Sequence, residues 1–364
     1  MQAYLYCVVG FVSIWLIFDV SDNISVLLDA RTGLLGIAKY YLTQLPQTVV
    51  ILLPVALLLA LLFSLGRMSR SNEIVSMLTA GVSVVRLLVP LVVIGILTAC
   101  ASLALNFALA PHADVARRVF VSGKTGKDVT GQIFRNRTDL RTWFVQRFRP
   151  GENVFNTVQV LQQDGDDHIT EGYLAGKAVY HGDTREWELQ NAKLVHYDNS
   201  GNIVSEESHP LLTISHWSET PYRLSSANFR AEQLGVAELQ TYLRSNSDFP
   251  ETLLAPFRTH FYYRWALPWT CLVVVFVAAP LGIGYSRRGV LGSVAAAIVL
   301  VFAMNFMSHL FLALGEGDRV RPWLAAWTPD LIFLVIGFYL LYLRSSNRDV
   351  SPFSLTALRR IVAR

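Results

Sequence analysis

The chain has 364 residues, of which 52% are hydrophobic and 16% are charged, and its formal net charge is +4. A typical soluble domain carries about 25% charged residues, so this composition excludes an ordinary soluble protein and indicates an integral membrane protein. The small basic excess is typical of cytoplasmic Lys and Arg in such proteins and does not indicate a nucleic-acid partner. The cysteines all lie in apolar runs, so we predict no disulfide framework: Cys7, Cys100 and Cys271.

Six apolar runs are long enough to cross a membrane, which takes about 20 residues. They cover roughly 2–18, 45–66, 85–110, 262–284, 289–314 and 326–343. No basic residue precedes the first run, so we interpret it as a membrane span rather than a signal peptide, and an upstream start would fit this interpretation.

Arginines gather at three places that lie on one side of a six-span protein. They follow the second run, the fourth run and the last run, with Arg67, Arg70, Arg86, Arg287 and Arg288 in the first two places. Because Lys and Arg are enriched in cytoplasmic loops, we expect these segments and both termini to be cytoplasmic.

The middle of the chain has a different pattern. Short runs of alternating polarity, such as TWFVQRF, VFNTVQVLQQ and EWELQNAKLVHYD, are separated by turn sequences such as DGDD and HGDTRE. This pattern predicts an all-β sandwich or open roll outside the membrane, and 231–246 is predicted to be helical. The expected organisation is spans in 1–110, a β-domain in 111–258, spans in 259–344 and a cytoplasmic tail in 345–364.

Sequence motifs for catalysis, nucleotide binding or metal binding are missing. The stretch GKTGKD, 123–128, lacks the Gly spacing and the Ser or Thr that a P-loop requires, so we predict a turn. The sequence contains no HExxH and no G-x-S-x-G. We therefore predict no catalytic residue, no metal and no cofactor bound by this chain. The tripeptide Asn136–Thr138 matches a glycosylation acceptor, to which we give little weight.

Few ionisable residues fall within the apolar runs. Asp330 lies near the start of the last run and is predicted to be interfacial. His309 lies inside the fifth run, where it is either a functional group or a neutral side chain bonded to a neighbouring helix. An ion-coupled carrier would need intramembrane carboxylates that these runs lack.

The segment between the second and third runs is amphipathic. Ile74, Met77, Leu78 and Gly81 fall on one helical face, and the segment 69–83 is predicted to be a cytoplasmic helix. Ser71 is expected to cap its start, with Glu73 in the first turn, where the helix dipole favours an anion. Two interpretations stay open: a connector resting in the lipid headgroups, or a helix whose apolar face fills a partner's groove.

Three stretches carry a resemblance to a known family. They are LPVALLLALLFSLGRMSRSNEIVSMLTAGVSVVRLLVPL, YYRWALPWTCLVVVFVAAPLGIGYSRRGVLGSVAAAI and LAAWTPDLIFLVIGFYLLYLR. With the order of three spans, β-domain and three spans, the chain resembles the LptF/LptG permeases of the lipopolysaccharide export ABC transporter. The resemblance covers nearly the whole chain and slightly favours LptG.

The resemblance implies an α-helical membrane protein with six transmembrane helices and an inserted, β-jellyroll-like periplasmic domain. In this family the two permeases pair in the bacterial inner membrane above an LptB ATPase dimer. Lipopolysaccharide enters the cavity between them and passes toward LptC and LptA-type bridge proteins. A competing hypothesis is a non-transporting scaffold whose β-domain assembles periplasmic partners.

The resemblance also assigns residues. The helix at 69–83 would be the coupling helix that contacts the ATPase, through Arg70, Glu73, Ile74, Val75, Met77 and Gly81. Basic residues at the outer ends of the spans would meet the anionic groups of lipopolysaccharide, namely Arg31, Arg117 and Arg118. Some members carry lysines at the outer end of the first span, whereas this sequence has Asp19, Asp22 and Asp29 there.

Overall fold

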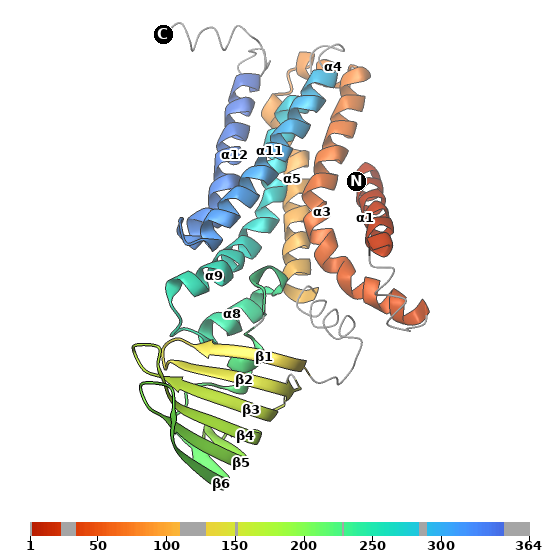
Figure 1. The fold of residues 1–364 in the computed structure, drawn as a ribbon. Coiled ribbons are helices and arrows are strands. Elements are labelled where there is room, and N and C mark those ends of the chain that lie inside the picture. Colours follow the sequence, from red (N-terminus) through yellow and green to blue (C-terminus); the bar gives the residue numbers. More distant parts are fainter. Residues whose placement is uncertain are drawn as a thin grey trace, which may run out of the picture. The chain divides into compact units, whose positions relative to one another are not determined.

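A computed structural model describes residues 2–22, 34–109, 129–149, 152–227, 229–283 and 290–345 (Figure 1). The chain divides into two compact units. A helical unit comprises Met1–Arg117, Gly235–Leu239 and Ala255–Arg364, and a sheet unit comprises Arg118–Leu234 and Gln240–Leu254.

The helical unit contains the six predicted spans. Its helices are α1 (Gln2–Asp22), α3 (Leu34–Arg70), α4 (Glu73–Thr79), α5 (Val84–Ala104), α9 (Glu251–Ala266), α10 (Thr270–Gly282), α11 (Val290–Glu316) and α12 (Pro322–Ser345). Within the described residues, six helical stretches are long and apolar enough to cross a membrane: 2–22, 44–70, 84–107, 251–282, 295–316 and 322–344. The prediction of six spans is therefore confirmed, with the fourth beginning about ten residues earlier than expected.

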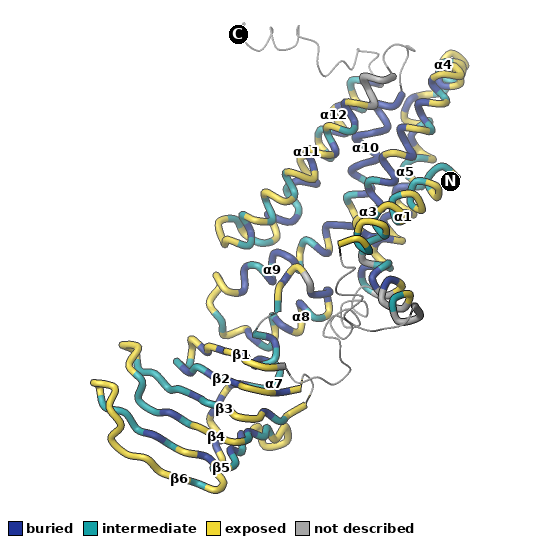
Figure 2. Tube along the Cα trace, turned by 45° about the vertical axis from the view of Figure 1, so that its right-hand side comes forward, coloured by how far each residue is buried: buried dark blue, intermediate teal, exposed yellow. Residues whose placement is uncertain are grey.

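Helix α10 forms the centre of this unit. It packs against α3, α5, α11 and α12, and nearly all of its side chains are buried, as its dark blue trace in Figure 2 shows. Its neighbours approach closely at two glycines. A Cβ placed on Gly95 would lie 2.8 Å from Val275 Cγ2, and one on Gly337 would lie 3.0 Å from Phe276. Small residues allow such close helix packing where no water drives association.

The fourth span is interrupted between α9 and α10 by the 3-10 turn η3 (Leu267–Trp269). Pro268 has no N–H, so the carbonyl of Arg264 loses its helical donor. The side chain of Asn106, in the π-helical turn η1 (Leu105–Leu109), donates to that carbonyl at 2.8 Å. The break in the helix is therefore satisfied from a neighbouring span, as backbone at membrane depth requires.

Two ionisable residues of the spans lie in different surroundings. Asp330 on α12 is buried inside the bundle, where the Thr270 hydroxyl donates to it at 3.3 Å, and its interfacial depth stays a prediction. His309 on α11 is exposed on the surface of the helical unit, and both of its predicted roles stay predictions.

The sheet unit is built on six antiparallel strands in chain order: β1 (Val129–Asn136), β2 (Arg141–Phe148), β3 (Val154–Gln163), β4 (Ile169–His181), β5 (Glu186–Tyr197) and β6 (Ile203–Ile214). The described strands form one sheet, which matches the open-roll alternative for this part of the chain. Helix α7 (Pro221–Ser225), the turn η2 (Ala231–Gln233) and α8 (Val236–Ser245) follow. The helix predicted over 231–246 is confirmed as η2 and α8.

A row of backbone irregularities crosses the sheet. Gly131, Thr157 and Asn191, on alternate strands, have positive φ angles of 73°, 51° and 51°. On each of β2 to β5, two neighbouring residues face away from the core at this row, and burial resumes on the third, as from Val145 to Phe148. The strand register is the same on both sides of this row, so it is a row of kinks and not of β-bulges, and the apolar side of the sheet stays continuous across it.

The core of the sheet unit is aromatic. The ring centroids of Trp143 and Trp187 lie 4.9 Å apart, and those of Trp143 and Trp217 lie 5.0 Å apart. The indole of Trp187 is fully buried and donates to the carbonyl of Glu219 at 2.8 Å. Alternation along the strands thus predicts which face of the sheet is buried. Trp217, from the segment after β6, packs against the aromatic side chains of that face.

A buried polar network holds the turn between β1 and β2. Arg141 Nε lies 3.1 Å from the fully buried Glu219 carboxylate and its Nη2 lies 2.7 Å from Asp139. Burial opposes ionisation of Asp139, but hydrogen bonds from Ser218, Arg141 and Asn136 outweigh it and hold the Asp139 pKa below its ordinary value. The Asn136 amide is buried and donates to Glu219 at 2.8 Å, so folded protein does not present it for glycosylation.

Candidate functional site

The corner between α3 and α5 contains α4, at one end of the helical unit (Figure 1). The expected helix over 69–83 is shorter in the structure, because α3 continues to Arg70 and α4 occupies only Glu73–Thr79. Asn72 precedes α4 with a left-handed φ of 61° and makes no side-chain cap. Two helices joined by this left-handed residue replace the single helix that periodicity indicates.

Ser71 does not cap α4, contrary to expectation. Its hydroxyl contacts the carbonyl of Arg67 at 3.1 Å and donates to the Glu73 carboxylate at 2.8 Å. Ser71 directly follows the last residue of α3 and lies one position before Asn72, the N-cap of α4. Its hydroxyl therefore does not accept from the first amides of α4. Its bond to Glu73 instead fixes the carboxylate near the start of α4, where the helix dipole favours an anion.

The end of α4 is fixed by Gly81, whose φ is +86°. The amide of Gly81 donates to the carbonyl of Leu78 at 3.1 Å, and the amide of Val82 donates to that of Met77 at 3.0 Å. These two bonds make a Schellman motif, in which glycine supplies the left-handed residue. The Ser83 hydroxyl then accepts from the Arg86 amide at 3.3 Å and starts α5.

The apolar side of α4 packs on the chain itself. Ile74 is completely buried in a cluster with Leu65 of α3, Leu88 of α5 and Ile283, which follows α10. Met77 and Leu78 are half-buried against the same cluster. The hypothesis that this apolar face fills a partner's groove is therefore wrong for Ile74, because neighbouring spans of the same chain already cover it.

The outward side of α4 is polar. Glu73, Ser76 and Gly81 are exposed, and so is Arg70, whose Nε donates to the Gly66 carbonyl at 3.3 Å. Val75 is half-buried between the two sides. The predicted coupling residues thus divide into a buried anchor and an exposed polar face that a partner can contact.

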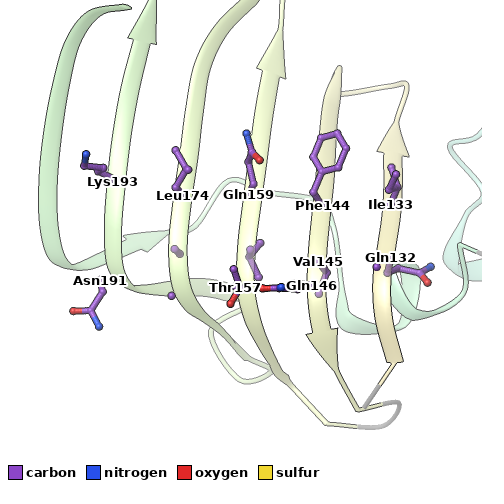
Figure 3. Close-up of a pocket in the computed structure, with 14 residues that line it drawn as sticks. Gln132, Ile133, Phe144, Val145, Gln146, Thr157, Gln159, Leu174, Asn191 and Lys193 are labelled. Atoms are coloured by element: carbon purple, nitrogen blue, oxygen red, sulfur yellow. The ribbon is translucent and has the colours of Figure 1, made fainter. Parts of the chain in front are cut away.

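The sheet unit carries a second feature, a shallow hollow of about 620 Å³ on the face away from the aromatic core. Figure 3 shows Ile133, Phe144, Gln159, Leu174 and Lys193 in a line across successive strands, one from each. Cross-strand pairing puts these five side chains on one face. Sequence alternation could have placed them there, but the kink row, which also lines the hollow, leaves no comparable pattern in the sequence.

The comparisons with known proteins decide the family. The family model described as lipopolysaccharide export system permease LptF/LptG matches residues 1–343. The chain belongs to this family. No curated protein matches it. The match does not distinguish LptF from LptG.

Membership in the LptF/LptG family fixes the general function. The six spans and the family together make this a multi-pass inner-membrane protein and a permease component of lipopolysaccharide export. The inserted sheet unit agrees with the expected fold class of helical spans with an all-β insertion.

The predicted lipopolysaccharide-binding residues of this LptF/LptG permease lie outside the described residues, as does the stretch 123–128. These residues are Arg31, Arg117 and Arg118. Their role stays a prediction. In the described hairpin between β3 and β4, ligand atoms of Asp164, Asp166 and His168 lie within 4.8 Å of one another. Asp164 there accepts from the Asp166 and His168 amides at 2.9 and 3.0 Å, which is an ordinary turn.

Proposed function

We propose that this permease is driven by ATP hydrolysis in a separate LptB-type ATPase dimer, and that α4 is the contact. The exposed polar face of α4, held rigidly by a buried Ile74 and by the Gly81 motif, is the observation that carries the proposal. Arg67 and Arg70, in the last turn of α3, and Arg86, in the first turn of α5, support a cytoplasmic location for this corner. The chain supplies the moving cavity wall and the partner supplies the chemical energy.

The remaining parts of the proposal follow the family. A sister LptF or LptG permease completes the cavity, and lipopolysaccharide leaves the inner membrane through it. Both termini are cytoplasmic and the sheet unit is periplasmic. The edge strands β1 and β6 of the described sheet support handover to LptC and LptA-type bridge proteins, because an edge strand can pair with another chain.

The test is co-purification of the full-length chain, with its sister permease, and the ATPase. Glu73→Lys reverses an exposed charge on α4 and is expected to weaken ATPase binding at least about tenfold. Glu152→Lys is the matched control, because Glu152 is equally exposed but lies in the sheet unit, and it should bind normally. If both variants retain the ATPase, α4 is not the contact.

A scaffold without transport activity is the competing function. It requires the sheet unit but not α4. A variant with a disrupted α4 would then assemble periplasmic partners and support growth as well as the native protein. The transporter proposal expects such a variant to lose lipopolysaccharide export while its sheet unit stays folded.

A further inference from the structure

The cluster around Ile74 joins four segments of the helical unit. It contains Leu65 of α3, Ile74 of α4, Leu88 of α5, Ala279 of α10 and Ile283 directly after α10. It adjoins the main apolar core, to which Leu62 of α3 and Leu281 of α10 belong. A displacement of α4 therefore acts on the ends of α3, α5 and α10, whose side chains make up the cluster.

The contact between α3 and the end of α10 has no spare volume. A Cβ placed on Gly282 would lie 2.6 Å from Leu65 Cδ1 and 3.0 Å from Leu65 Cβ. Leu65 is 2% exposed, so its side chain has no open space to enter. Close-packed interiors transmit strain rather than absorb it, and a contact without free volume does so directly.

We propose that Gly282 and Leu65 are positioning residues that couple α4 to α10. Movement of α4 by a bound ATPase displaces the end of α10, and α10 carries the displacement to α11 and α12, against which it packs. This inference rests on the proposed function of α4 and names the internal contact through which it acts. Neither residue touches the ATPase, because both are buried.

The test uses the complete complex in proteoliposomes: this chain, its sister permease, the ATPase and a soluble bridge protein. The measured quantity is lipopolysaccharide delivered to the bridge protein per ATP hydrolysed. Gly282→Ala forces Leu65 away, and Leu65→Ala opens a gap. Each is expected to lower the ratio about 3- to 10-fold while ATPase binding is retained.

Two further variants separate coupling from general damage. The double variant Leu65→Ala with Gly282→Ala removes the 2.6 Å approach to Leu65 Cδ1, leaves only the 3.0 Å approach between the two Cβ atoms, and should recover part of the ratio lost in each single variant. Gly95→Ala adds the same methyl against α10, 2.8 Å from Val275 Cγ2, about two turns from Gly282. It is expected to keep the native ratio, and an equal loss in Gly95→Ala would overturn the proposal.

The outcomes also distinguish this inference from the proposed function. If the native complex binds no ATPase, the proposed function itself fails. If the ATPase binds and is active, but Gly282→Ala and Leu65→Ala both deliver lipopolysaccharide at the native ratio, only the coupling through this contact is wrong. Should Gly282→Ala not fold, Leu65→Ala still decides the question, because removing methyl groups introduces no clash.

Discussion

Arg141 is the cation that faces the completely buried carboxylate of Glu219 in the sheet unit. Arg141→Met would leave that charge unpaired, which typically costs about 3–5 kcal/mol. We expect the sheet unit to unfold at correspondingly lower urea concentration, followed by tryptophan fluorescence. Arg135→Met is the control, since its pair with Asp167 is exposed and worth at most about 1 kcal/mol. Equal shifts in the two variants would contradict the account.

Asp139 predicts a pH dependence. Hydrogen bonds and Arg141 hold its folded-state pKa below its unfolded value of about 3.9, despite burial, so the fold favours the ionised form. Its contribution to stability is complete above the unfolded pKa and is lost as pH falls through the lower, folded value. Asp139→Asn should therefore lose stability at pH 7 and show a shallower decline below about pH 4. Identical pH profiles for the variant and native chain would sink this assignment.

For single residues, the sequence predicts the kind of role better than it predicts which side chains a residue contacts. The apolar face of α4 was predictable from spacing, but its partners were not, because Ile74 packs on the neighbouring helices α3 and α5 together with the end of α10, which lies far away in sequence. Ser71 has the residue type of a cap, yet α3 extends past its expected end and moves the start of α4 beyond it. Asn136 matches an acceptor motif, and only the fold reveals that its amide is buried against Glu219.

Among the elements, α4 depends on one glycine. Gly81 has φ +86° and open space around its missing Cβ, so replacement acts through the backbone alone. Gly81→Ala is expected to cost about 1–2 kcal/mol locally and to speed amide hydrogen exchange across 76–84. Gly81→Asn should be milder, because Asn tolerates the left-handed region. Gly10→Ala, in the middle of α1, is the control, and comparable exchange in both alanine variants would rule out the motif's role.

The kink row of the sheet stores strain at Thr157, a β-branched residue with φ 51°. Thr157→Gly should relieve the left-handed strain and stabilise the sheet unit by about 1 kcal/mol, measured by urea unfolding. Thr142→Gly, on β2 at an ordinary backbone angle, should destabilise the sheet unit by a similar amount. Destabilisation by both variants would show that Thr157 is not strained.

The strands were predictable from alternating polarity and the spans from the length of their apolar runs, and the structure confirms both sets. The kink row was not predictable, because each strand bears only a two-residue interruption that resembles a turn or an irregular edge. Pro268 signals the break in the fourth span, but the sequence does not show what compensates it, because Asn106 lies 158 residues from Arg264, whose carbonyl it satisfies.

The whole chain is an LptF/LptG permease of lipopolysaccharide export, and this level was predictable from the order of spans and sheet together with three family-like stretches. The lipopolysaccharide-binding role of Arg31, Arg117 and Arg118 stays a prediction. The division of α4 into a buried anchor and an exposed face emerges only from the folded bundle. The central claim is that this exposed face contacts the ATPase.

Photocrosslinking tests that claim most directly. A benzophenone amino acid replaces Ser76, which is exposed on α4, in the full-length chain assembled with its sister permease and the ATPase. The same replacement at Ser13, exposed in the middle of α1, is the control. We predict that the ATPase is captured from position 76 and not from position 13. Absence of capture from position 76 in an intact, ATP-hydrolysing complex would contradict the account.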